Sequence, residues 1–171
     1  MSYGILLLRL VVGVAFVGHG TQKLFGWFGG YGPEGTGGFF ASKGYRAPVL
    51  MAVAAGLAEA GGGTLLGLGF ATPLAAALLA TVMINAIASV TLKKGFMLGS
   101  EIEITYLTIA VSLAAIGPGR FSIDRAIGWD DNISGVWWGV AALGVALAVS
   151  FLTLTLGRSR PVEKQEPAAQ T

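Results

Sequence analysis

Long apolar stretches alternate with short polar segments along the chain, and this pattern predicts helices that cross a membrane. A spanning helix needs about 17–25 mostly apolar residues. Five stretches approach or reach that length, over residues 4–28, 49–68, 73–92, 101–116 and 135–156. We therefore predict an all-α fold, a transmembrane helix bundle in which four core helices are followed by an additional C-terminal transmembrane helix.

The segments that join these stretches hold most of the turn-forming and charged residues. Residues 29–46 are rich in glycine, which predicts a flexible turn, and within it residues 39–43 can form a short helix in the membrane interface. Pro48 suits the first turn of the helix that follows. Glu101 and Glu103 suit a helix N-terminus, although Glu103 can also point inward and add a carboxylate to a polar pocket.

The same pattern divides the chain into three parts. Residues 1–125 form the membrane bundle, residues 126–156 form a polar loop with the additional helix, and residues 157–171 form a polar tail that we expect to be disordered. No internal repeat is visible, which argues against a transporter built from inverted repeats.

The amino-acid composition agrees with a lipid environment and excludes several kinds of partner and cofactor site. Apolar residues make up 54% of the chain and charged residues 12%, whereas a soluble domain carries about 25% charged residues. The net charge of +2 is small and divided among the loops, so nucleic acid is not an expected partner. The chain has no cysteine and one histidine, so its ligand count excludes an iron–sulfur cluster, a bis-histidine haem or a zinc site made by this chain alone.

Basic residues are unevenly shared between the two sides of the predicted bundle. With five spans, the first and third connections lie on the same side as the tail, and this side holds Lys23, Lys43, Arg46, Lys93, Lys94, Arg158, Arg160 and Lys164. The other side holds Arg120 and Arg125, with Arg9 just inside the membrane. Since cytoplasmic loops carry the excess of Lys and Arg, we expect an external N-terminus and a cytoplasmic C-terminus in a bacterial plasma (inner) membrane.

Each ionisable residue inside an apolar stretch needs a partner or an interfacial position, because a charge in hydrocarbon costs about 2.5–3.5 kcal/mol. Arg9 can snorkel to the head groups or form an internal ion pair. Glu59 lies near the middle of the second stretch, too deep for its short side chain to reach water. The first two stretches share one connection and should pack as antiparallel neighbours, so we expect Glu59 to pair with His19, Lys23 or Arg9. A proton-transfer or ligand-binding role for Glu59 is the alternative.

A candidate cofactor-binding site follows from the same residues. His19, Gln22 and Lys23 share one helical face, and with Glu59 they can build a polar pocket near one membrane interface. The structural alternatives are a hydrogen bond between helices for His19 and snorkelling for Lys23. For Asn85, a bridge between helices is the favoured interpretation.

Several of these residues lie in segments that resemble the DoxX family. The matching segments are Arg9-Leu10-Val11-Val12-Gly13 with Phe16, His19-Gly20, Lys23-Leu24-Phe25-Gly26, Ala55-Gly56-Leu57-Ala58-Glu59 with Gly61-Gly62, Met83 with Ala86, and Gly117-Pro118-Gly119-Arg120 with Ser122 and Asp124. The resemblance covers roughly residues 5 to 125 and implies a four-helix membrane bundle, from which the fifth helix departs. It also implies redox chemistry, because DoxX-like proteins resemble small subunits of thiosulfate:quinone oxidoreductase, and others are linked to oxidative-stress complexes with superoxide dismutase and a sulfurtransferase.

We expect no catalytic site and no metal site made by this chain alone, and three functions remain open. The favoured one is an accessory or anchoring subunit of a membrane redox or oxidative-stress complex, with the lipid bilayer, proteins of that complex and a second copy of the chain as partners. The second is a quinone-binding subunit of an oxidoreductase, in which His19, Gln22 and Lys23 hydrogen-bond a quinone carbonyl and Glu59 relays protons. The third is a small-solute or proton transporter that uses Glu59 as its titrating group.

Overall fold

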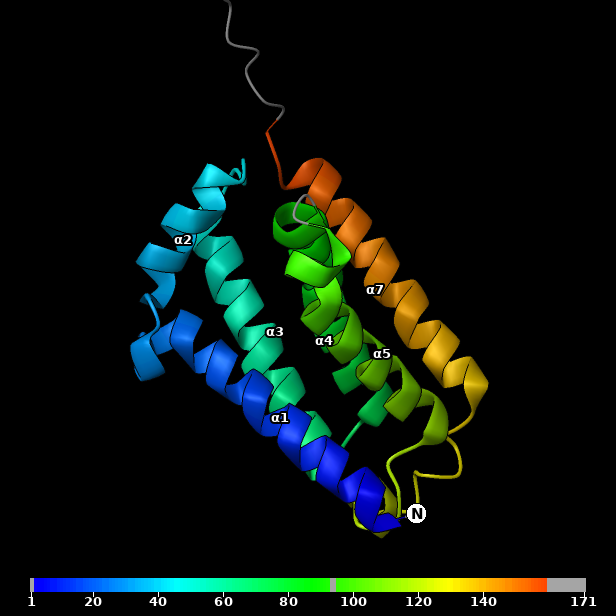
Figure 1. The fold of residues 1–171 in the computed structure, drawn as a ribbon. Helices are drawn as coiled ribbons and strands as arrows, with labels where there is room; N and C mark the ends of the chain where they lie inside the picture. Colours follow the sequence, from blue (N-terminus) through cyan, green and yellow to red (C-terminus); the bar gives the residue numbers. More distant parts are fainter. Residues whose placement is uncertain (1, 93–94, 160–171) are drawn as a thin grey trace, which may run out of the picture.

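The computed structural model describes residues 2–92 and 95–159, and in these ranges every regular element is helical (Figure 1). In chain order the elements are α1 (Ser2–Phe25), η1 (Trp27–Gly29), α2 (Gly32–Ser42), α3 (Pro48–Leu68), α4 (Thr72–Ala86), η2 (Ile87–Thr91), η4 (Phe96–Ser100), α5 (Glu101–Ile116), α6 (Ile123–Ala126) and α7 (Val136–Leu156).

Four helices are long and apolar enough to cross a membrane: Ser2–Phe25, Pro48–Leu68, Thr72–Thr91 and Val136–Leu156. The third of these joins α4 to the π-helical turn η2. Helix α5 has the predicted bounds and is shorter, at 16 residues, with η4 directly before it. These elements confirm an all-α transmembrane bundle with an additional C-terminal helix.

Successive long helices run in opposite directions. In Figure 1 the chain begins at the lower end of the bundle, and α7 finishes at the upper end, beside the α2–α3 and α4–α5 connections. The start of α1 and the end of α7 therefore lie at opposite ends of the bundle, as five alternating helices require.

Glycine lets the backbones of α1 and α3 touch. A Cβ atom added to Gly13 would lie 2.6 Å from the carbonyl oxygen of Gly63, and one added to Gly20 would lie 2.6 Å from that of Gly56. Close packing through small residues is a common way for membrane helices to associate. The predicted antiparallel packing of these helices is confirmed, and it brings the middle of α3 against α1.

The predicted loop at residues 29–46 is wrong over most of its length, because it contains α2. The helix predicted at residues 39–43 is only the last part of this longer one. Pro33 lies in the first turn of α2, and a Cβ atom on Gly37 would lie 2.8 Å from the Val49 side chain. Packing against α3 thus outweighs the low helix propensity of glycine.

Residues 157–159, at the start of the predicted tail, are ordered against the α2–α3 connection. The Arg46 amide donates to the Gly157 carbonyl at 2.9 Å, and the Ser159 amide donates to the Gly44 carbonyl at 2.7 Å. These three residues of the predicted tail thus contact the bundle, and the rest of that tail, residues 160–171, lies outside the described ranges.

Candidate functional site

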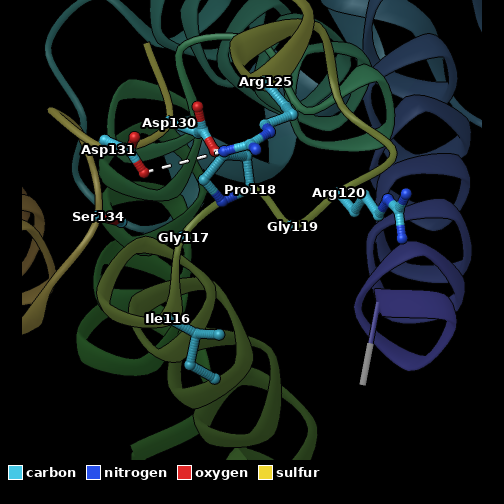
Figure 2. Close-up of a pocket in the computed structure, with 9 residues that line it drawn as sticks. All are labelled: Ile116, Gly117, Pro118, Gly119, Arg120, Arg125, Asp130, Asp131 and Ser134. Carbon is cyan, nitrogen blue, oxygen red and sulfur yellow. Dashed lines mark hydrogen bonds and ion pairs between the residues drawn. The ribbon is translucent and has the colours of Figure 1, made fainter. Parts of the chain in front are cut away.

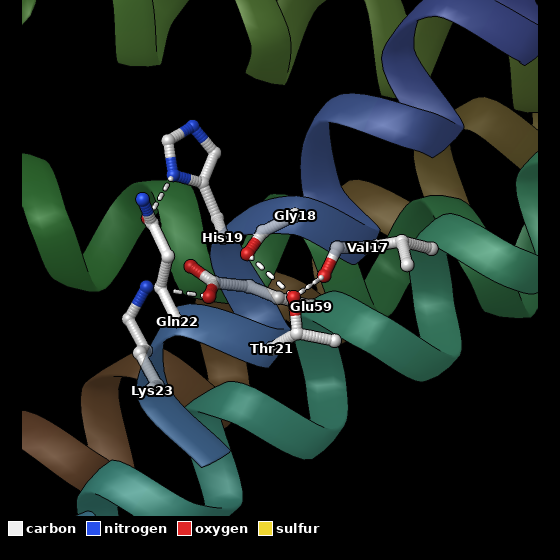
Figure 3. Close-up of polar contacts among 7 residues, drawn as sticks. All are labelled: Val17, Gly18, His19, Thr21, Gln22, Lys23 and Glu59. Atoms are coloured by element: carbon white, nitrogen blue, oxygen red, sulfur yellow. Dashed lines mark hydrogen bonds and ion pairs between the residues drawn. The ribbon is translucent and has the colours of Figure 1, made fainter. Parts of the chain in front are cut away.

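A partly buried ion pair joins α1 to α3. Lys23 Nζ lies 2.5 Å from Glu59 Oε2, and the Glu59 side chain is only 4% exposed (Figure 3). Gly20 and Gly56 lie about one helical turn away, and their close approach brings the short carboxylate within reach of α1. The prediction that Glu59 pairs with the first helix is confirmed, and Lys23 is the partner.

His19 and Gln22 lie beside this pair on a more open part of α1. His19 is exposed, and its Nδ1 lies 3.2 Å from Gln22 Oε1. Gln22 Nε2 in turn donates to the carbonyl oxygen of Phe28 at 3.2 Å. Figure 3 shows Gln22 between His19 and Lys23, so these polar residues form a row along the helix rather than a ring around one point.

An apolar cavity of about 420 Å³ begins at the ion pair. Helices α2, α3, α4 and α7 build most of its wall from alanine, valine, leucine and aromatic side chains. Of the four residues predicted to bind a cofactor, Lys23 and Glu59 line the cavity, and His19 and Gln22 do not. The volume lies within the roughly 300–1,000 Å³ of small-molecule sites, which are typically apolar with a few polar groups.

The cavity opens at the outer surface of the bundle. Val145 and Val149 of α7 line it, and they are 53% and 43% exposed. In a membrane, an opening bordered by exposed valines faces lipid, so an apolar molecule can enter from the bilayer.

Asn85 joins α4 to α7 at the cavity wall. Its Nδ2 donates to the carbonyl oxygen of Thr81 and to Ser150 Oγ, both at 2.9 Å. The predicted bridge between helices is confirmed. Its Oδ1 is buried and has no hydrogen-bond partner among the described residues.

Tyr45 lines the cavity and contacts Arg158, which follows α7. Its hydroxyl lies 2.9 Å from Ser89 Oγ, and the Arg158 guanidinium lies over its ring, 5.6 Å from the ring centre. Arg158 also donates two hydrogen bonds to the Lys43 carbonyl, at 3.0 and 2.8 Å. We call the contact of residues 157–159 with residues 43–46 the C-terminal clasp.

Arg9 fulfils neither expectation, because it does not snorkel and makes no direct ion pair with any residue in the described ranges. Its side chain is buried, and the guanidinium donates to the carbonyl oxygens of Leu66, Gly67 and Pro118. Two of these carbonyls lie in the last turn of α3, where carbonyl groups lack i→i+4 partners, and the Leu66 carbonyl also accepts from the Gly69 amide at 3.0 Å. The sequence showed how deep Arg9 lies along the first helix. It could not show that the C-terminus of α3 lies against Arg9.

Asp124 is a structural residue whose role the sequence did not reveal. It is fully buried and accepts hydrogen bonds from the amides of Ala71 and Thr72 and from Thr72 Oγ1, at 2.8, 3.1 and 2.8 Å. These groups begin α4, so Asp124 caps that helix while Arg9 caps the end of α3. The only signal in the sequence was the place of Asp124 in a segment that resembles the DoxX family.

A second cavity, of about 470 Å³, lies at the α5–α7 connection (Figure 2). Arg125 Nη1 donates to Asp130 Oδ2 at 2.6 Å and lies 3.9 Å from Asp131 Oδ1. The hydrogen bond with Asp130 raises the pKa of Arg125 above its ordinary value. These charges satisfy one another within the loop, so the apolar cavity is the better candidate for a binding site.

The apolar cavity can bind a molecule that has an apolar body and a polar head. Lys23 keeps N–H groups that Glu59 does not use, and Glu59 accepts hydrogen bonds. Within residues 2–92 and 95–159, no three His, Cys, Asp or Glu side chains lie where they could hold a metal ion.

Comparisons with known proteins agree with this architecture. The DoxX family model matches residues 4–92. The chain is 36% identical over 121 residues to the Bacillus subtilis (strain 168) protein named "Putative oxidoreductase CatD", a match that covers 71% of this chain and 84% of that protein. No solved structure matches the chain. With its long apolar helices, the chain belongs to the DoxX family and is a multi-pass membrane protein.

Proposed function

We propose that this chain is a membrane subunit of a redox system and that it binds a quinone in the apolar cavity. The observation that carries the proposal is the Lys23–Glu59 pair, which lies at the wall of an otherwise apolar cavity. A buried charge pair is costly to maintain, and a polar group at the wall of an apolar site commonly fixes the orientation of a ligand.

The residues of the cavity fit the chemistry of a quinone. A quinone has an apolar ring and tail and two carbonyl oxygens, and when bound it supplies a carrier for two electrons and two protons. Lys23 would donate a hydrogen bond to one carbonyl oxygen. Glu59 would hold the ammonium group in place and would accept a proton from the hydroquinone when that form of the ligand is oxidised. Phe39 and Phe40 line the cavity and would pack against the ring or the tail.

Other proteins would complete the redox system. An iron–sulfur cluster requires several cysteines, or histidines with cysteines, and this chain has no cysteine and one histidine. The name of the Bacillus relative refers to an oxidoreductase, which supports a redox setting here. We therefore propose that the chain serves as an accessory or anchoring subunit that presents the quinone to a partner.

Binding of a quinone analogue tests this proposal. The chain purified in mild detergent should bind decylubiquinone, and the double variant Lys23→Met with Glu59→Gln should weaken binding about tenfold or more, since it removes hydrogen bonds to a charged donor. Replacing both partners leaves no unpaired buried charge, and the thermal transition of the variant verifies folding. His19→Ala, outside the cavity, is the matched control and should bind normally. No binding, or equal binding by the double variant, would refute the proposal.

We also propose that the C-terminal end of α7 faces the cytoplasm of a bacterial plasma membrane. The support is the basic residues around the clasp, which include Lys43, Arg46 and Arg158. The chain has no cysteine, so single substitutions Ser2→Cys and Ser159→Cys give clean labelling sites. In intact cells a membrane-impermeant maleimide should label the first and not the second, and the reverse pattern would refute this orientation.

A further inference from the structure

Tyr45 joins two walls of the apolar cavity. It belongs to the α2–α3 connection, which lies at the end of the bundle where α7 finishes (Figure 1). Ser89 of η2 also lines the cavity, and its Oγ lies 2.9 Å from the Tyr45 hydroxyl. Tyr45 lines the cavity and is itself only 8% exposed, so its side chain lies between the cavity and the solvent at this end.

The C-terminal clasp holds Tyr45 from outside the cavity. The Arg158 guanidinium lies over the Tyr45 ring, and two hydrogen bonds from Arg158 to the Lys43 carbonyl fix the guanidinium there. Without the clasp, Tyr45 would keep its hydrogen bond to Ser89 and its contact with the Phe40 ring, whose centre is 5.2 Å away. One neutral hydrogen bond and one ring contact stabilise a side chain only weakly, so the position of Tyr45 depends on the clasp.

The clasp can open without unfolding of the helices. Its main-chain contacts are the hydrogen bonds from the Arg46 amide to Gly157 and from the Ser159 amide to Gly44. Arg46 and Ser159 are exposed, so water can replace these hydrogen bonds. Segments with few buried apolar contacts and exposed hydrogen bonds open locally at a small cost in free energy.

We propose that the clasp is a latch on a second entrance to the cavity, at which Tyr45 excludes water while the clasp is closed. The opening beside Val145 and Val149 admits apolar molecules from lipid, whereas the clasp end admits water-soluble molecules when the clasp opens. The latch does not depend on which molecule the cavity binds. For a bound quinone, it would decide when a water-soluble electron carrier reaches the ligand.

A single cysteine in the cavity wall reports access from water, because the chain has no cysteine of its own. Ala86→Cys places a thiol in the wall about one helical turn before Ser89. Ser2→Cys, in the first turn of α1 at the opposite end of the bundle, is the control position. The chain in mild detergent is treated with a sulfonated, water-soluble maleimide, and mass spectrometry follows the rate of labelling.

Opening the clasp should speed labelling of Ala86→Cys. Arg158→Ala should raise the rate about tenfold or more, because the clasp loses a charged donor. Ser159→Pro keeps Arg158 but removes the amide that donates to Gly44, and it should also raise the rate. Arg46→Ala removes the same charge from an exposed side chain and should leave the rate unchanged.

Three results would overturn the latch. The first is an unchanged rate at Ala86→Cys in both Arg158→Ala and Ser159→Pro. The second is an equal increase in Arg46→Ala, which would be an effect of charge on the reagent. The third is an equal increase at Ser2→Cys, which would mean that the whole bundle has loosened.

Further variants keep the test decisive. Tyr45→Ala removes the side chain that excludes water, so slow labelling of Ala86→Cys in that background would also overturn the latch. If Arg158→Ala does not fold, the comparison of Ser159→Pro with the unaltered chain decides. Because none of these measurements uses a quinone, the latch can fail while the proposed function stands, and quinone binding can fail while the latch stands.

Discussion

Arg9 illustrates how a charged residue can lie inside this bundle without a counter-ion in direct contact. Its guanidinium is satisfied by the carbonyl oxygens at the end of α3 and at Pro118, and the two oxygens of α3 lie at the negative end of that helix's dipole. Asp124 has the complementary role at the start of α4, where its carboxylate accepts hydrogen bonds from backbone amides that have no partner within the helix. These two buried side chains therefore hold the turn between α3 and α4. Replacing either of them should destabilise the fold more than replacing a charged residue on the surface.

Arg9→Met should lower the free energy of unfolding by roughly 3–5 kcal/mol, because three carbonyl oxygens lose a charged donor. The measurement is reversible unfolding in mixed micelles. Arg120→Met is the matched control, since Arg120 is exposed near the same end of the bundle, and it should change stability by less than about 0.5 kcal/mol. Equal effects of the two variants would contradict the capping role of Arg9.

Asp124→Ala should lower the free energy of unfolding by about 2 kcal/mol or more, since it removes the cap of α4 and leaves buried amides without a partner. The thermal transition in detergent reports the change. Asp131, which is 92% exposed, supplies the control Asp131→Ala. A normal thermal transition for Asp124→Ala would show that the cap is dispensable.

At the scale of elements, the bundle depends on places where backbones touch. Helices α1 and α3 approach so closely that Gly13 and Gly20 have no room for a side chain. Glycine content alone suggested a flexible turn at residues 29–46, and this was wrong because close packing against α3 makes α2 a helix. Sequence shows where glycine lies, but whether it serves a turn or a helix contact depends on which helix faces it.

Gly20→Ala should force α1 and α3 apart, because its new Cβ atom would lie within 2.5–2.7 Å of atoms of Ala60 and Gly56. Overpacking of this kind costs about 1–3 kcal/mol. Gly18→Ala is the control on the same helix, since a Cβ there meets nothing within 4 Å. If both variants unfold at the same temperature, the α1–α3 contact is looser than described.

The C-terminal clasp predicts a local effect. Arg158→Ala removes two hydrogen bonds to the Lys43 carbonyl and the contact over the Tyr45 ring, so amide exchange of residues 43–46 should become faster while the long helices keep their protection. Arg46→Ala, whose side chain is exposed, should leave exchange unchanged. Unaltered exchange in Arg158→Ala would mean that the side chain of Arg158 does not hold the clasp.

At the scale of the whole molecule, the apolar pattern predicts the five main helices to within a few residues, because a helix in lipid satisfies its own backbone and shows only apolar side chains. Depth along the helices also predicted that Glu59 needs a partner in α1. The cavity could not be predicted, because it depends on which faces of α3, α4 and α7 meet and on small residues such as Ala55 and Ala58 that leave space between them. Helix α7 proves to be part of that wall rather than an appendage to the bundle.

The most direct test of the central claim is the position of a bound quinone. An azido-quinone photolabel is activated with the purified chain, and the modified peptides are identified by mass spectrometry. We predict labels within residues 39–45, 51–59, 77–90 and 145–153, all suppressed by excess unlabelled quinone. Labels confined to the outer face of α1 around His19, or labels that excess quinone does not suppress, would contradict a quinone site in this cavity.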